Sequence, residues 1–256
     1  MRRFTALLMT LLLLASFANA EESPLTLRTA TSVEEVLQFL TLPPEEGIAD
    51  VQPGYIRYIA QHEDRDPAFR TAYWLGGEED SMLDLTVKQR NGIDYGFHAG
   101  VMCTRAVYSM ALSCLGIDMS PGEMSAVTGE RNLNEPYDVI SEIVGVERIV
   151  RKSNVFNTMM ENYLNNDNYS PVYLYIKKPS GNYHALLVVA FMPDVSRYLV
   201  VDPNPHYDED GELCRVYFIS LNKLRTEIIN STFRTELAGS KVLQLHQWRL
   251  DEDSGN

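Results

Sequence analysis

The chain has 256 residues, of which 45% are hydrophobic, which is enough for one sizeable domain with its own core. Its formal net charge at pH 7 is −13, so a nucleic-acid backbone or an anionic lipid surface would repel it on average. Both classes of partner are therefore excluded from the expected functions.

The first 20 residues have the layout of a cleavable signal peptide. Two arginines follow the initial methionine, an apolar stretch runs from Phe4 to Phe17, and small residues end the segment at Ala20. The apolar stretch is short for a bilayer span, and no later stretch is apolar for long enough. We expect a secreted or periplasmic protein whose mature chain starts at Glu21, with an uncleaved N-terminal tether as the alternative.

Residues 21–85 are expected to form an N-terminal helical appendage or cap. The stretch "SVEEVLQFL" predicts an amphipathic helix in which Ser32 is the N-cap and Glu35 completes a capping box. After a proline-rich break, "GYIRYIAQH" (54–62) predicts a second helix. None of these residues suggests chemistry, although a secreted hydrolase could use such a segment as a propeptide or as one wall of a cleft.

Residues 96–129, "GFHAGVMCTRAVYSMALSCLGIDMSPGEMSAVTG", predict two consecutive helices. Apolar side chains share one face of the first helix, which stops at Gly116, and Ser120 caps the second. Cys103 lies in the first turn, where unpaired backbone N–H groups and the helix dipole favour a thiolate over a thiol. Cys103 is therefore a candidate nucleophile; a cysteine that only begins a buried face is the alternative.

The three cysteines leave an odd one in an exported chain. Cys103 and Cys114 are roughly 16 Å apart along one predicted helix, which is too far for a disulfide. A disulfide between Cys114 and Cys214 stays open, but we favour two small buried thiols.

The pattern changes after residue 170 from helical period to strand alternation. Five stretches are β-rich and are separated by turn sequences: "PVYLYI", "YHALLVVAF", "SRYLVVD", "CRVYFIS" and "KVLQLHQW". Helices come first and strands follow, so we predict an α+β fold with an antiparallel sheet or half-barrel. Such an order lets a helix N-terminus dock against the sheet across a cleft.

A histidine and an aspartate stand at the two ends of an apolar hairpin in this region. If residues 192–194 form a three-residue loop, His184 opposes Asp202 with Cβ atoms roughly 5 Å apart. A five-residue loop would place Val188 opposite Asp202 and would weaken this pairing. An aspartate that fixes the tautomer of a histidine lets the other ring nitrogen take a proton from a thiol. The chain has these three residue types in Cys103, His184 and Asp202.

These residues resemble the papain-like cysteine peptidases, in particular the C39-like peptidase group. The resemblance covers residues 86–220 and lies in the segment "CTRAVYSMALSCLGIDMSPGEMSAVTG", the Pro-led strand "PVYLYI", and the strands "HALLVVAF" and "YLVVDP". It implies that Cys103 is the nucleophile, that His184 is the general base and later the acid, and that Asp202 orients the imidazole. The reaction would be amide hydrolysis of a peptide or protein substrate through an acyl-thioester.

The same resemblance implies a papain-like domain over residues 86–250, in which the nucleophile helix packs on the C-terminal sheet, followed by an acidic tail at 251–256. The family has Gly-Pro after its cysteine and a glutamine about six residues before it, whereas this chain has Thr104-Arg105 and Phe97. His98 or Gln89 is therefore expected to donate to the oxyanion together with the backbone N–H of Cys103. A loop histidine without a role is the alternative for His98.

Two other functions use the same residues. A transglutaminase-like or deamidating enzyme needs the same three residue types, and an inactive papain-like fold could bind a peptide. The acidic stretch "HYDEDGE", with Asp208, Asp210 and Glu212, lacks the closing bidentate glutamate of a calcium loop, so we expect an acidic turn. No metal site and no cofactor are expected.

Overall fold

The computed structural model describes most of the chain, in segments 24–42, 49–61, 89–90, 93–94, 103–128, 135–192, 197–220, 237 and 239–251. The expected signal peptide and His98 lie outside these residues. None of the helices in these segments is long and apolar enough to cross a membrane.

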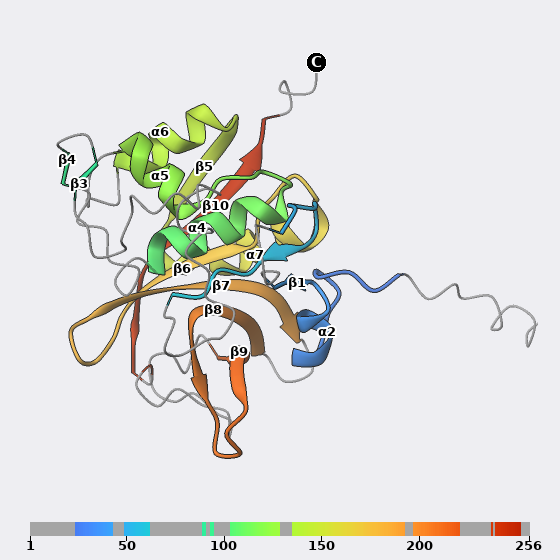
Figure 1. The fold of residues 1–256 in the computed structure, drawn as a ribbon. Helices are drawn as coiled ribbons and strands as arrows, with labels where there is room; N and C mark the ends of the chain where they lie inside the picture. The colour runs from blue at the N-terminus through green and yellow to red at the C-terminus, as the bar shows by residue number, and fades with distance from the viewer. Residues whose placement is uncertain are drawn as a thin grey trace, which may run out of the picture.

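A six-stranded antiparallel sheet forms the second half of the protein (Figure 1). Its strand order is β5-β10-β6-β7-β8-β9, with strands β5 (Val146–Arg151), β6 (Val172–Lys177), β7 (Tyr183–Met192), β8 (Arg197–Tyr207), β9 (Leu213–Ile219) and β10 (Lys241–Leu250). The five predicted strands and the α+β order are confirmed. Strand β5 was not predicted, and β8 continues past the predicted turn at residue 203.

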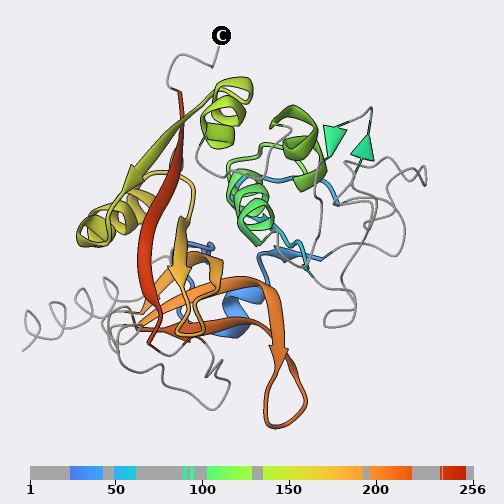
Figure 2. The ribbon, with the colours of Figure 1, turned by 90° about the vertical axis from the view of Figure 1, so that its left-hand side faces the viewer.

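Helix α4 (Cys103–Cys114) packs against β6, β7, β8 and β10, and the sheet curves around it (Figure 2). All twelve of its residues are buried, so the prediction of a single apolar face was too narrow. Its two serines are accommodated because their hydroxyls donate to carbonyls: Ser109 Oγ to Met119 O at 2.6 Å, and Ser113 Oγ to Met110 O at 2.8 Å.

The predicted boundaries of this helix pair are confirmed. Gly116 follows α4 with φ +82°, the left-handed conformation that favours glycine. Helix α5 (Pro121–Thr128) begins after Ser120, whose side chain accepts from the backbone N of Glu123 at 3.2 Å. The Glu123 carboxylate accepts from the backbone N of Ser120 at 2.7 Å, which completes a capping box.

Three further helical elements surround the sheet: α6 (Glu135–Ile143), η2 (Ser153–Val155) and α7 (Phe156–Asn165). Helix α6 packs against α5 and β5, and α7 packs against β6. Near the N-terminus, α2 (Val33–Leu37) begins after Ser32, whose side chain accepts from the backbone N of Glu35, as predicted.

The predicted helix over 54–62 is wrong, because its described part contains strand β2 (Ile56–Arg57), which pairs in parallel with β1 (Leu40–Thr41). Residues 56–61 are all buried in succession, and no amphipathic helix has six consecutive buried positions. The backbone N of Arg57 donates to Ser113 Oγ at 3.0 Å, so α4 supplies a partner to this segment.

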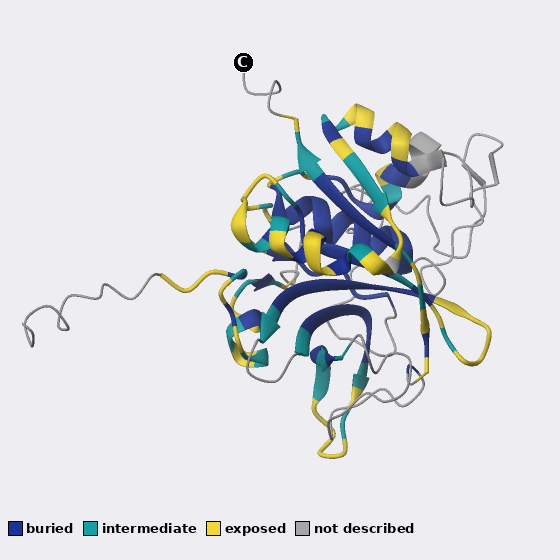
Figure 3. Ribbon diagram, turned by 180° about the vertical axis from the view of Figure 1, so that it is seen from behind, coloured by how far each residue is buried: buried dark blue, intermediate teal, exposed yellow. Residues whose placement is uncertain are grey.

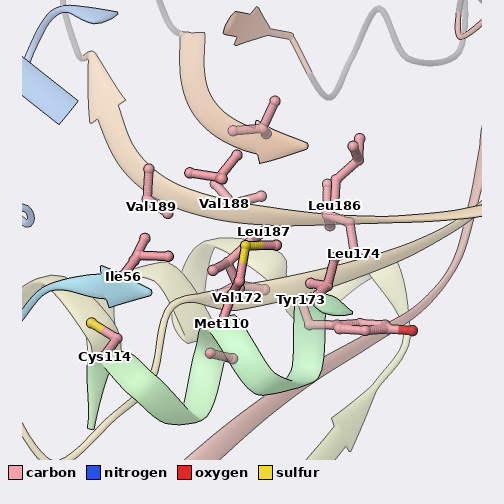
Figure 4. Close-up of a cluster of buried hydrophobic side chains, with 14 of the residues drawn as sticks. Ile56, Met110, Cys114, Val172, Tyr173, Leu174, Leu186, Leu187, Val188 and Val189 are labelled. Carbon is pink, nitrogen blue, oxygen red and sulfur yellow. The ribbon is translucent and has the colours of Figure 1, made fainter. Parts of the chain in front are cut away.

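Ile56, Tyr58, Ile59 and Ala60 belong to the same hydrophobic core as α4 and the sheet. Figure 3 shows the buried parts of the chain in dark blue. Figure 4 shows Ile56 beside Met110 and Cys114 of α4, below Val188 and Val189 of β7. At the far end of α4, the backbone N of Gly54 donates to Cys114 O at 2.9 Å.

Candidate active site

Cys103 is the first residue of α4 and is 6% exposed. The first turn of a helix leaves backbone N–H groups without intrahelical partners, and the helix dipole places its positive end there. The sulfur therefore lies where a negative charge is stabilised.

The two residues after the cysteine, Thr104 and Arg105, are buried against Tyr137 of α6. Burial raises the pKa of Tyr137 to about 12, while hydrogen bonds from the Tyr173 and Thr104 side chains lower it and the charge of Cys103 raises it. The Tyr137 and Tyr173 hydroxyl oxygens are 3.4 Å apart. Thr104-Arg105 thus anchors the start of α4 against α6.

His184 and Asp202 are directly hydrogen-bonded. His184 is 3% exposed near the start of β7, and its Nε2 atom lies 2.8 Å from Oδ1 of Asp202, which is completely buried. The Cys103 side chain lies close enough to the same imidazole to raise the pKa of His184. Since Nε2 is engaged by Asp202, Nδ1 is the nitrogen that remains for the thiol. The structure therefore brings the three predicted residues together.

The buried carboxylate of Asp202 has two further donors. Its Oδ1 atom also accepts from the backbone N of Asn204 at 2.8 Å, and Oδ2 accepts from the Tyr217 hydroxyl at 2.8 Å. The Tyr58 hydroxyl donates to the backbone carbonyl of Asp202 at 3.0 Å. These bonds compensate for the loss of water around a buried charge and fix the direction of the carboxylate.

The predicted register of the hairpin is wrong, although the side-chain contact is found. Met192 pairs with Arg197, so four residues lie between them, and an extra residue at Val189 then shifts the ladder by one. The last regular pair is Leu187 with Val201, which places Asp202 across from Leu186 rather than from His184. The two side chains therefore meet diagonally, at a separation that a histidine can span.

The bulge at Val189 decides which face Asp202 occupies. The four-residue loop alone would place Asp202 opposite Leu187, and the side chains of Leu187 and His184 point to opposite faces of the strand. With the extra residue at Val189, Asp202 lies across from Leu186, whose side chain points to the same face as that of His184. The carboxylate and the imidazole therefore share a face.

The sequence "DPNP" from Asp202 to Pro205 explains why the aspartate leaves the regular ladder. Val201 pairs with Val216 and His206 pairs with Cys214, so these four residues face only one residue of β9. The two prolines have no N–H to give to a ladder. The Pro203 carbonyl instead accepts from the backbone N of Gln61 at 2.6 Å, which links segment 49–61 to the site.

The environment of His184 favours its protonated form. Burial alone would lower the pKa of His184. The neighbouring Asp202 and Cys103 side chains raise it by more than burial lowers it, so the pKa of His184 rises from 6.5 to about 9. At neutral pH the imidazolium therefore lies between the sulfur of Cys103 and the carboxylate of Asp202. A thiolate and an imidazolium are the reactive pair of a thiol hydrolase.

The two predicted oxyanion donors stay predictions. The backbone of Gln89 lies in strand β3 (Gln89–Arg90), paired with β4 (Ile93–Asp94), and His98 lies outside the described residues. The backbone N–H of Cys103, at the N-terminus of α4, is the donor that the fold places beside the sulfur.

All three cysteines are free thiols, so the disulfide between Cys114 and Cys214 is not formed. Burial raises the pKa of Cys114 to about 11. Cys214 is only half-buried, which differs from the favoured prediction; burial followed by the charge of Asp208 raises the pKa of Cys214.

The acidic stretch after β8 is a turn. Oδ1 of Asp208 accepts from the backbone N of Asp210 at 3.0 Å and of Glu212 at 2.8 Å, which closes the β8–β9 hairpin. Within the described segments, no three histidine, cysteine, aspartate or glutamate side chains are grouped so that they could hold a metal ion.

Sequence reasoning missed the tyrosines around the triad. Tyr217 and Tyr58 bind Asp202, and Tyr137 packs against the first turn of α4. Tyr217 follows Val216, the residue paired with Val201, so only the register of β8 and β9 reveals that it reaches Asp202.

No protein-family model matches this sequence, and no curated protein matches it.

Proposed function

We propose that this chain is an exported cysteine peptidase, or a related amide-bond hydrolase, with a papain-like fold of the C39-like type. One observation carries the proposal: Cys103, at the N-terminus of a buried helix, lies close enough to the His184 imidazole to raise its pKa, and Nε2 of that imidazole is hydrogen-bonded to the buried Asp202. The signal peptide expected over the first 20 residues supports a location in the periplasm or outside the cell.

In the acylation step the Cys103 sulfur attacks the carbonyl carbon of the scissile amide. The carbonyl oxygen becomes an oxyanion, which the backbone N–H of Cys103 can bind. The His184 imidazolium gives its Nδ1 proton to the leaving nitrogen, the C–N bond breaks, and the amine departs. An acyl-thioester on Cys103 and a neutral imidazole remain.

In the deacylation step the neutral imidazole of His184 takes a proton from water as the water oxygen attacks the thioester carbonyl. The C–S bond then breaks, the acid product leaves, and the thiolate and imidazolium return together. Asp202 keeps the ring in the tautomer and orientation that both steps require, because it accepts from Nε2 throughout.

The proposal predicts that iodoacetamide at mildly acidic pH alkylates Cys103 much faster than Cys114 or Cys214. The pKa of each of the other two thiols is raised, so they stay protonated and unreactive there. Mass spectrometry of the digested protein would identify the labelled cysteine.

The matched control is His184→Gln, which removes the imidazolium beside the sulfur and is expected to slow the alkylation of Cys103. A catalytically inactive peptide-binding protein would show a different result, with Cys103 no more reactive than Cys114. That outcome would overturn the proposed function.

A further inference from the structure

The two carboxylate oxygens of Asp202 are bound by different side chains. Oδ1 lies 2.8 Å from His184 Nε2, whereas Oδ2 accepts from the Tyr217 hydroxyl, also at 2.8 Å. Asp202 is completely buried and Tyr217 is 1% exposed, so bulk water does not compete for this bond. The phenol hydroxyl therefore replaces part of the hydration that a buried carboxylate has lost.

The sheet places Tyr217 on the same face as Asp202 and His184. Tyr217 of β9 pairs with Val200 of β8, and side chains two residues apart along a strand share a face, so Tyr217 and Asp202 lie on one side. Asp202 lies across from Leu186, whose side chain points to the same face as that of His184. The three side chains thus form one row across three adjacent strands, with the carboxylate in the middle.

The proton between His184 and Asp202 has two possible positions. On Nε2 it gives an imidazolium and a carboxylate, and on Oδ1 it gives a neutral imidazole and a carboxylic acid. A hydroxyl that donates to Oδ2 stabilises the carboxylate more than the acid, since donors bind a charged oxygen more strongly. The Tyr217 hydroxyl therefore favours the imidazolium, and the imidazolium favours the thiolate of Cys103.

We propose that Tyr217 is a positioning residue of the site, whose hydroxyl keeps Asp202 ionised and thereby sets the lowest pH at which Cys103 and His184 form a thiolate–imidazolium pair. When Asp202 takes up a proton, the imidazolium loses its counter-charge and gives its Nδ1 proton to the thiolate. Without the hydroxyl, Asp202 takes up that proton at a higher pH. This inference rests on the proposed function, because that function assigns the ion pair to Cys103 and His184.

Other titratable groups surround this row and are common to the proteins compared below. They include Cys103 of α4, His206 of β8, Arg215 of β9, Tyr58 of segment 49–61, and Glu34 and Glu35 of α2, which packs against β9. The His206 ring lies edge-on to the Tyr217 ring, with centroids 5.6 Å apart. Because Tyr217→Phe keeps this ring, it removes only the hydroxyl.

The test is the pH dependence of the rate at which iodoacetamide alkylates Cys103, with each profile scaled to its own rate at about pH 7. On the acidic side, the rate of Tyr217→Phe should fall at a pH about one unit higher than that of the wild type. At a pH on this slope, the scaled rate of the variant is then roughly ten-fold lower. Circular dichroism at each pH checks that both proteins are folded. Coincident profiles, or a fall displaced to lower pH, would overturn the inference.

A second substitution keeps the buried hydrogen bond and so does not depend on the stability of Tyr217→Phe in acid. 3-Fluorotyrosine in place of Tyr217 retains the hydroxyl and makes it a stronger donor, because the fluorinated phenol is more acidic. The fall in the alkylation rate should then move to lower pH. An unchanged or higher position would contradict the role of the hydroxyl.

Tyr58→Phe is the matched control. The Tyr58 hydroxyl is also buried and also binds Asp202, but it donates to the backbone carbonyl rather than to the carboxylate. Whatever this variant does to the absolute rate, its acidic fall should keep the wild-type position. A shift as large as that of Tyr217→Phe would show that loss of packing, not loss of the donor on Oδ2, moves the profile.

The proposed function and the role of Tyr217 fail in different ways. If Cys103 of the wild type is not alkylated at mildly acidic pH, the proposed function fails and the role of Tyr217 fails with it. If Cys103 is alkylated rapidly and its pH profile does not respond to Tyr217, only the role of Tyr217 fails.

Discussion

Replacing Cys103 with Ala is expected to lower peptide hydrolysis by roughly 1,000-fold or more, because no other group can form the acyl-thioester. The free energy of unfolding should change by less than about 1 kcal/mol or should rise, since active-site groups are often kept at a cost to the fold. Digestion of a peptide library, followed by mass spectrometry, measures the first quantity. Urea unfolding of the same preparation measures the second.

Cys114→Ala is the matched control, because Cys114 is a buried cysteine on the same helix. Removing the Cys114 sulfur leaves a small cavity in the core and should lower the free energy of unfolding by about 1 to 2 kcal/mol. Hydrolysis by the folded protein should be unchanged. The opposite pattern would refute the assignment: a Cys103→Ala protein that hydrolyses peptides at nearly the wild-type rate, or that loses activity only in proportion to unfolding.

Raising the pH through the range from about 6.5 to about 9 is expected to remove stability on the order of 1 to 3 kcal/mol from the wild type. The pKa of His184 is raised from 6.5 to about 9 in the folded protein, so folding favours its protonated form. This contribution is complete below the unfolded pKa and is lost as the pH rises through the folded pKa. Urea unfolding at a series of pH values measures the loss.

Two variants separate the histidine from other groups that titrate in this range. His184→Gln has no imidazole and should lack this part of the pH dependence. Asp202→Asn can still accept from His184 Nε2 and from the Asn204 backbone N through its amide oxygen, so it removes mainly the charge. The pH-dependent loss should be smaller in this variant. Parallel pH curves for the wild type and His184→Gln would show that the imidazolium is not stabilised in the fold.

The local signals in the sequence predicted the elements of the site well. The position of Cys103 in the first turn of a helix, the stop at Gly116 and the capping box at Ser120 are all confirmed, because caps and glycine conformations depend on residues close in the chain. The alternating strands around His184 and Asp202 are confirmed for the same reason.

The parts that depend on distant contacts could not be predicted. The pairing of Met192 with Arg197 and the bulge at Val189 together set the register, and both depend on contacts between the two strands rather than on local sequence. The segment 54–61 was wrongly predicted to be helical, because its pairing with β1 and its burial against α4 are tertiary effects that outweigh local preference. The tyrosines that surround Asp202 become neighbours only through that packing.

Trapping an acyl group on Cys103 tests whether this cysteine forms the acyl-thioester. The protein is mixed with p-nitrophenyl acetate for less than one turnover, quenched in acid, digested and analysed by mass spectrometry. We expect one acetyl group on the peptide that contains Cys103, removed by hydroxylamine as expected of a thioester and absent from the Cys103→Ala protein. Acetylation confined to Cys214 or to lysines, with Cys103 unmodified, would show that Cys103 is not the nucleophile.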